Sequence, residues 1–181
     1  MRADDAFLLC AVMPKPSAPP RRYWLLKSEP GSFSIDALMA APNRTTLWDG
    51  VRNYQARNFM RDDMRPGDGV LFYHSNAEPT GVAGLAEVAS GAGLDPTALD
   101  PAHKGYDPRS RPGAPTWVAI EVRGVERFPA VVPLTALRAD PQCATLQVLR
   151  RGNRLSITPV TEAEWIAVCA LGRGPGGTGR A

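Results

Sequence analysis

Metal-binding and crosslinking residues are scarce in this chain. Its 181 residues include only three cysteines, Cys10, Cys143 and Cys169, which stand far apart, and two histidines, His74 and His103. A zinc site needs a denser set of ligands, and a disulfide scaffold needs a larger, paired set of cysteines. We therefore expect no metal, no cofactor and a reducing compartment, with Cys169 as a small buried hydrophobe.

Long hydrophobic runs are also missing, so the sequence offers no candidate for a membrane-spanning helix. The short apolar segment 6–13 follows Asp4 and Asp5, whose negative charges are unlike the start of a signal peptide. We expect a protein that is not secreted and contacts no membrane: cytoplasmic if bacterial, nuclear if eukaryotic. Prolines make residues 1–22 an extended, flexible segment, in which Met13 is an alternative start of translation.

Signatures of common enzyme classes are absent as well. The chain has no G-x-S-x-G elbow, no H-E-x-x-H and no H-x-E with a P-C-x-x-C partner, and Gly81 and Gly84 lack dinucleotide-binding spacing. Asp49 and His74 offer an acid and a base, but no nucleophile accompanies them. We expect no catalytic residues, which leaves an enzyme acting on a flipped base as a less favoured alternative.

The composition fits one globular domain. Hydrophobic residues make up 44% of the chain, enough for one core, and the net charge of +3 is compatible with a polyanionic partner without indicating one. The glycine-rich residues 172–181 imitate the spacing of a phosphate-binding loop, but Arg180 stands where that loop requires lysine. We expect a flexible tail there. The oligomeric state stays open, with a monomer as the expectation.

Short strands dominate the pattern along the chain, with a few helices beside them. Strand signals cover residues 23–27, 69–75, 81–89 and 117–125, the last with period-two alternation. Ser34 predicts the start of a short helix that Pro42 stops, and Thr161 with Glu164 predicts a capping box opening a helix that Gly172 closes. The sequence therefore predicts an α+β domain.

The richest segment is WDGVRNYQARN at residues 48–58, which combines aromatic, amide, carboxyl and guanidinium groups. An indole can stack on a planar ring, amides and carboxylates can address a base edge, and guanidiniums suit phosphates. Together these groups indicate recognition of a nucleotide held out of its stack.

The same segment also allows a purely structural interpretation. Gly50 can form a turn, Asn53 can cap a helix that begins at Tyr54, and Trp48 and Tyr54 can be core residues. Composition alone does not decide between the two interpretations.

Four blocks then give the segment a family context. They are YWLLKSEP at residues 23–30, TLWDGVRNYQARNF at 46–59, GVLFYHSN at 69–76 and RLSITPV at 154–160, with YDP at 106–108 between the last two. In order and spacing these blocks resemble the EVE domain family, whose PUA-like fold is related to the YTH readers of methylated RNA. The resemblance implies a small open β-barrel with short peripheral helices over residues 23–171.

The resemblance also implies a modified-base pocket, with 5-methylcytosine in DNA or a modified base in RNA as its ligand. Trp24 and Trp48 would be stacking walls, and Tyr73 or Tyr106 would close the side. The candidate base-binding residues are Trp24, Lys27, Ser28, Trp48, Asp49, Asn53, Tyr54, Tyr73, His74, Ser75 and Tyr106, and the candidate phosphate-binding residues are Arg52 and Arg57.

Several of these residues have simpler structural interpretations. Trp24 and Trp117 can belong to the core, His74 can be a hydrogen-bonded structural histidine, and His103 is expected to be exposed. The alternative functions are an RNA-binding or tRNA-binding module, or a protein-interaction module, without specificity for a modified base.

Overall fold

A computed structural model describes residues 20–174 of the chain, and the expectations for the Pro-rich start, Met13, Cys10 and the glycine-rich end lie outside these residues. The strands are β1 Tyr23–Ser28, β2 Thr45–Trp48, β3 Gly69–His74, β4 Gly81–Val88, β5 Gly93–Leu94, β6 Val118–Pro133 and β7 Ile157–Val160. The α-helices are α1 Ile35–Ala40, α2 Tyr54–Asn58, α3 Leu134–Ala139 and α4 Glu162–Arg173.

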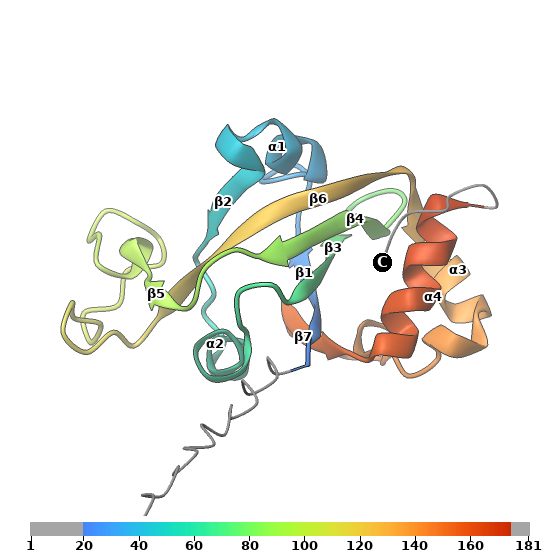
Figure 1. The fold of residues 1–181 in the computed structure, drawn as a ribbon. Coiled ribbons are helices and arrows are strands. Elements are labelled where there is room, and N and C mark those ends of the chain that lie inside the picture. The colour runs from blue at the N-terminus through green and yellow to red at the C-terminus, as the bar shows by residue number, and fades with distance from the viewer. Residues whose placement is uncertain (1–19, 175–181) are drawn as a thin grey trace, which may run out of the picture.

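The strands form one mixed sheet of seven strands in the order β2-β6-β4-β3-β1-β7, with β5 paired to β6. The sheet does not close into a complete barrel, as its path ends at β2 and at β7. Figure 1 shows α3 and α4 together at one end of the molecule and β5 with its loops at the other. The predicted α+β class, with an open sheet and short helices, is therefore confirmed.

The central strands β1 and β3 run parallel, with Leu25 opposite Leu71 and Leu26 opposite Phe72. All four of these side chains are fully buried. Because consecutive residues of a strand point to opposite faces, each pair belongs to a different side of the sheet. Two separate cores follow: Leu26 and Phe72 belong to the first, and Leu25 and Leu71 to the second.

Strand β6 is longer than the sequence predicts, because it continues past the alternating segment 117–125 to Pro133. It pairs with β2, β4 and β5, and its register with β4 shifts twice. Register shifts of this kind bend a strand and increase its twist. The bend lets a single strand hold the small strands β2 and β5 at one end of the sheet while its other end leads to α3.

The helix starts are as the sequence predicts. Ser34 accepts a hydrogen bond from the Ala37 backbone N–H, and Thr161 forms a capping box with Glu164. The predicted end of α4 at Gly172 is wrong, because the helix continues to Arg173 and ends at Gly174, whose φ is +69°. Gly172 is buried instead against Phe128, where an added Cβ would overlap the aromatic ring.

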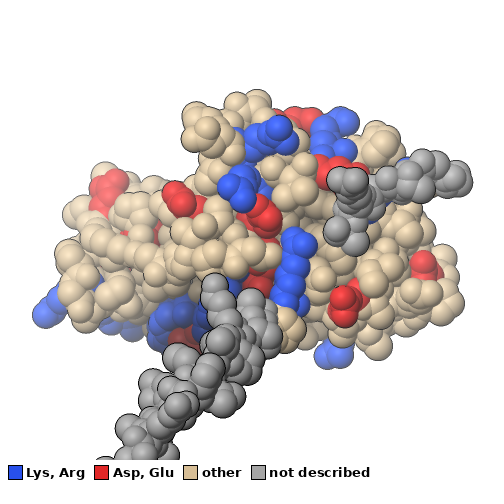
Figure 2. Space-filling view, in the orientation of Figure 1, with Lys and Arg blue, Asp and Glu red and all other residues tan. Residues whose placement is uncertain are grey.

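None of the helices between residues 20 and 174 is long and apolar enough to cross a membrane. On the face shown in Figure 2, the Lys and Arg side chains of the described residues lie beside Asp and Glu side chains and do not merge into one broad basic patch. On this face, any attraction for a polyanion must therefore come from local groups rather than from the field of the whole face.

Candidate functional site

The segment 48–58 leaves the sheet at the end of β2, and its first five residues, 48–52, form one wall of a cleft. Trp48 is the last residue of β2 and pairs with Ile120 of β6. Gly50 then turns the chain with a φ of +71°, a conformation that a residue with a Cβ rarely adopts. The Asn53 side chain accepts hydrogen bonds from the backbone N–H groups of Gln55 and Ala56 and so starts α2.

The cleft measures about 610 Å³, a size typical of small-ligand sites. It lies where the end of β1, the following loop, the end of β2 and the loop before β7 meet a loop from the far end of the sheet. Its lining residues are Lys27, Ser28, Glu29, Ser32, Phe33, Thr46, Leu47, Trp48, Asp49, Gly50, Val51, Arg52, His103, Lys104 and Ser156.

Two aromatic side chains line this cleft, Trp48 and the half-buried Phe33. Trp48 is only 9% exposed, and its ring meets Phe72 edge to face with 5.6 Å between the centroids. The indole is therefore held in one orientation by the first core. A flat, rigid aromatic surface of this kind can stack on a planar ring at low entropic cost.

Asp49 supplies a carboxylate beside that indole. Partial burial raises the pKa of this carboxyl above its ordinary value, and the nearby charge of Asp95 raises it further. A carboxylate that is disfavoured in this way gains from an N–H donor brought by a ligand.

Lys27 and Ser28 approach the cleft from β1. Burial lowers the pKa of the Lys27 ammonium, whose Nζ lies 3.4 Å from the Asn153 carbonyl oxygen. Ser28 Oγ donates a hydrogen bond of 2.6 Å to the Phe33 carbonyl, which ties β1 to the loop that carries Phe33. The Ser28 hydroxyl proton is thus already used, so Ser28 can offer a ligand only its oxygen lone pairs.

Arg52 lines the cleft but is bound within the protein. Its guanidinium donates to the carbonyls of Gly105 and Val51, to Asp95 Oδ2 at 2.6 Å and to Thr97 Oγ1. These four bonds use four of the five N–H donors of an arginine. Arg52 therefore anchors the loop beside the cleft and has little capacity left for a phosphate.

Asn53 caps α2, and Tyr54 and Arg57 belong to that helix; all three lie outside the lining of the cleft. The structural interpretation of Asn53 as a helix cap is confirmed. Tyr54 stacks on Trp117 with 4.9 Å between the centroids, and the Arg57 guanidinium lies 4.8 Å from the Tyr54 ring centroid. Arg57 also donates to the Thr116 carbonyl and to Asn58. The structure does not bring these three residues together with Trp48.

Trp24, Tyr73, His74 and Ser75 also lie outside the lining of this cleft. Trp24 is buried, and its Nε1 donates to Asp68 Oδ2 at 2.9 Å. Tyr73 belongs to the second core, on the face of the sheet opposite Phe72 and Trp48. Of the two predicted walls, only Trp48 lines this cleft, whereas Trp24 packs against Phe59 and lines a different cavity.

His74 is confirmed as a hydrogen-bonded structural histidine, since its Nε2 accepts a bond from the Ile35 backbone N–H. Burial lowers the pKa of its imidazole, in agreement with a neutral acceptor. Ser75 is held at the end of β3, where its backbone N–H and Oγ both donate to the Ser28 carbonyl.

The lining residues that sequence reasoning missed include Phe33, Lys104 and Ser156. The expectation for His103 was wrong, because this side chain is half-buried, lines the cleft and accepts a hydrogen bond from the Gly105 N–H through Nδ1. The sequence pattern that could have indicated Lys104 is the basic residue close to an aromatic residue in Lys104-Gly105-Tyr106. Tyr106 itself lines a neighbouring cavity rather than this cleft.

Comparison with known proteins gives this geometry a context. Residues 22–171 match the family model described as the EVE domain. Human thymocyte nuclear protein 1 is 39% identical over 165 residues, which cover 82% of this chain and 73% of the relative. The crystal structure of human THYN1 protein in complex with DNA containing 5-methylcytosine has a TM-score of 0.76 and 39% identity, over 84% of this chain and 98% of that one.

A more distant likeness concerns the fold alone. The YTH domain of the Zygosaccharomyces rouxii MRB1 protein, solved with N6-methyladenosine RNA, has a TM-score of 0.51 and 16% identity over 93% of this chain and 96% of that one. The predicted kinship of the fold with YTH domains is confirmed.

Proposed function

The chain belongs to the EVE domain family, and on that premise we propose that it binds a modified nucleobase of a nucleic acid in the cleft beside Trp48. The observation that carries the proposal is the pairing of a fixed indole with a carboxylate, Trp48 with Asp49, at one wall of a cleft of about 610 Å³. The crystallised human THYN1 protein, whose ligand is DNA containing 5-methylcytosine, supports cytosine methylated at C5 as the base.

The chemistry of the wall suits a cytosine-type base. The ring would stack on Trp48, and a stacked base contributes about 1–3 kcal/mol. The exocyclic amino group of cytosine is a donor that carboxylates accept, which gives Asp49 its role. The methyl group adds about 0.8 kcal/mol where it leaves water, and Phe33, Leu47 and Val51 are apolar residues that line the cleft.

The residues that we propose for the phosphate contacts differ from the expected Arg52 and Arg57. Because Arg52 and Arg57 donate to protein acceptors, we assign the phosphates to Lys27 and Lys104, which line the same cleft. Binding through these two ammonium groups makes the affinity depend on salt concentration.

We further propose that the protein is a reader and not an enzyme. An acid-base pair of Asp49 and His74 would need the imidazole as its base. The His74 Nε2 already accepts a hydrogen bond from the Ile35 backbone N–H, so this nitrogen is not free for that role. The functional unit is the domain at residues 23–171, with 1–22 and 172–181 as flanking segments. Its location would be the cytoplasm in a bacterium and the nucleus in a eukaryote.

Titration of fluorescently labelled oligonucleotides tests this function. Single-stranded and duplex DNA would each carry one cytosine or one 5-methylcytosine, and RNA would carry adenosine or N6-methyladenosine. We expect tighter binding to the 5-methylcytosine DNA, and a loss of about tenfold or more in Asp49→Asn, because the hydrogen bond to a charged acceptor is replaced by a neutral one. Asp49 is exposed at the rim, so this variant should fold normally.

The matched control is Asp100→Asn, which removes one exposed carboxylate in the same half of the molecule and outside the cleft lining. Equal affinity of the wild-type protein for modified and unmodified oligonucleotides would contradict the proposal. It would favour a module that binds nucleic acid without specificity for a modified base. Release of a free base or a deaminated product would contradict the assignment as a reader.

A further inference from the structure

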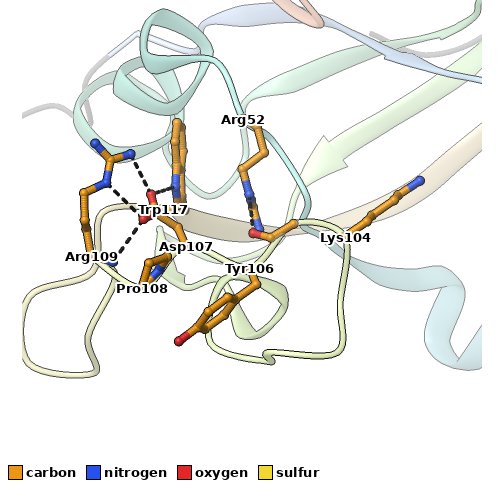
Figure 3. A pocket seen from close by; sticks show the side chains of 8 residues that line it. Arg52, Lys104, Tyr106, Asp107, Pro108, Arg109 and Trp117 are labelled. Carbon is orange, nitrogen blue, oxygen red and sulfur yellow. Dashed lines mark hydrogen bonds and ion pairs between the residues drawn. The ribbon is translucent and has the colours of Figure 1, made fainter.

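A second cavity lies directly beside the cleft. It measures about 490 Å³ and is lined by Arg52, Lys104, Gly105, Tyr106, Asp107, Pro108, Arg109 and Trp117. Arg52 and Lys104 line both cavities. Figure 3 shows the Arg52 side chain reaching the loop between the side chains of Lys104 and Tyr106. The two cavities are therefore neighbours along one surface, with Lys104 at their boundary.

The loop that forms this second cavity is held in place by buried anchors. Asp107, which is buried, accepts hydrogen bonds from Trp117 Nε1 at 2.8 Å and from the Arg109 backbone N–H and guanidinium. The Asp107 backbone N–H donates to the Ala98 carbonyl, and Arg52 Nε donates to the Gly105 carbonyl. A loop fixed in this way has little ordering entropy left to lose when it binds a ligand.

The groups that this rigid loop presents to solvent are aromatic and cationic. Tyr106 is 42% exposed, and its ring is not stacked on any aromatic side chain within residues 20–174. Lys104 is exposed and forms no ion pair with a described residue. Arg109 is paired with Asp107, yet its side chain remains 71% exposed. In Figure 3 the Tyr106 hydroxyl points away from the protein.

We propose that this second cavity binds the nucleotide adjacent to the modified base on the same strand. The adjacent base stacks on Tyr106, and Lys104 contacts the phosphate that joins the two nucleotides. This inference rests on the proposed function, because it assumes that a base occupies the cleft beside Trp48. It adds a second subsite and assigns that subsite to the loop at residues 104–109.

Chemistry and position both favour a nucleotide over other occupants. An exposed aromatic ring next to cations is the combination with which proteins hold single-stranded nucleic acid, the ring stacking on a base and the cations following the backbone. A ligand that extends from the first cleft into the second cavity passes Lys104 and Arg52, because these residues line both cavities. The exposed face of Arg109 lies on the far side of Tyr106 and suits the next phosphate along.

Comparison of a nucleoside with a trinucleotide tests the inference. The probes are 5-methyl-2′-deoxycytidine, which can fill only the first cleft, and a single-stranded DNA trinucleotide with 5-methylcytosine in the middle. Binding is followed by NMR titration of the ¹⁵N-labelled full-length protein. We expect Tyr106→Ala to weaken trinucleotide binding at least about fivefold and to leave nucleoside binding unchanged. Tyr106→Phe keeps the aromatic ring and should restore trinucleotide binding.

Lys104→Ala tests the phosphate contact separately. Each phosphate contact to single-stranded nucleic acid contributes about 0.7 to the slope of log affinity against log salt, so the slope for the trinucleotide should fall by about that amount. Arg111→Ala is the matched control, since it removes one exposed positive charge from the same loop but lines neither cavity. Its slope should equal that of the wild type.

The outcomes separate this inference from the proposed function. If the nucleoside binds the cleft but Tyr106→Ala and Lys104→Ala bind the trinucleotide as the wild type does, the second subsite and the phosphate contact of Lys104 are wrong, and base binding in the first cleft stands. If the nucleoside and trinucleotide both fail to shift the signals of Trp48 and Asp49, the proposed function itself is wrong. Signals around Tyr106 that shift with the trinucleotide but not with the nucleoside would support the subsite.

Discussion

The Arg52 guanidinium and the Asp95 carboxylate lie 2.6 Å apart, and the Asp95 side chain is completely buried. The same carboxylate accepts hydrogen bonds from the backbone N–H groups of Gly50 and Thr97. It thereby joins the turn after Trp48 to the start of the loop region that carries Lys104. The walls of the cleft are held together through this one buried anion.

Removal of Arg52 should therefore destabilise the protein. Arg52→Ala leaves Asp95 buried without its cation, and breaking a buried pair costs about 3–5 kcal/mol, reduced here to about 2–3 kcal/mol because Arg52 is 25% exposed. Arg52→Lys keeps the charge but cannot make the four bonds, so it should lose part of the stability. Chemical denaturation measures both.

Arg127→Ala is the matched control for that prediction. The Arg127–Asp36 pair is exposed on both sides, with side-chain exposures of 52% and 63%. Exposed pairs contribute about 0–1 kcal/mol. Similar losses of stability in Arg127→Ala and Arg52→Ala would show that the buried position of Asp95 has no special importance.

Trp48 has a structural and a proposed binding role, which two substitutions separate. Trp48→Ala should destabilise the fold by about 3–5 kcal/mol, because the indole is 9% exposed and packs on Phe72. Trp48→Phe keeps an aromatic ring in the core and should retain most of the stability while weakening binding of the 5-methylcytosine oligonucleotide. Thermal denaturation and oligonucleotide titration are run on the same samples. Full stability of Trp48→Ala would show that the ring is not part of the core.

Gly172 should resist substitution although it lies in a helix. Alanine normally stabilises a helix relative to glycine, but here the added Cβ would overlap the Phe128 ring. We expect Gly172→Ala to lower the free energy of unfolding by about 1–3 kcal/mol. Gly113→Ala is the control, since nothing lies within 4 Å of its added Cβ. A gain of stability in Gly172→Ala would contradict the packing of α4 against β6.

The thiols of Cys143 and Cys169 should be inert in the folded protein. Burial raises the pKa of each thiol to about 11, so the reactive thiolate is scarce at pH 8, and both side chains are also shielded from the reagent. In a Cys10→Ser variant, we expect slow modification by a thiol reagent under native conditions and two rapid modifications in denaturant. Modification that is rapid at pH 8 without denaturant would contradict this burial.

The sequence predicts the local features of the fold well and the partners of the site poorly. The strand starts at Tyr23 and Gly69 and the caps at Ser34 and Thr161 follow from short-range patterns, and all four agree with the structure. The end of α4 was wrong because the constraint on Gly172 comes from Phe128, which lies far away in the sequence.

Partners that lie far away in the sequence also explain why Arg52 and Arg57 are bound within the protein. Arg52 and Arg57 look like phosphate ligands in a list of neighbouring residues, but their acceptors are at Asp95, Gly105 and Thr116, more than forty positions downstream. No local pattern reveals such pairings. The sequence grouped the residues at strand ends more successfully. Lys27, Ser28, Trp48 and Asp49 all line one cleft because β1 and β2 both end there.

A crystal structure of the protein bound to a single-stranded oligonucleotide with one 5-methylcytosine would show directly whether the cleft beside Trp48 holds the base. We expect the methylated base inside the cleft, with its ring on the Trp48 indole and its exocyclic amino group within hydrogen-bond distance of the Asp49 carboxylate. A methylated base bound elsewhere on the protein, with the cleft beside Trp48 left to solvent, would contradict this expectation.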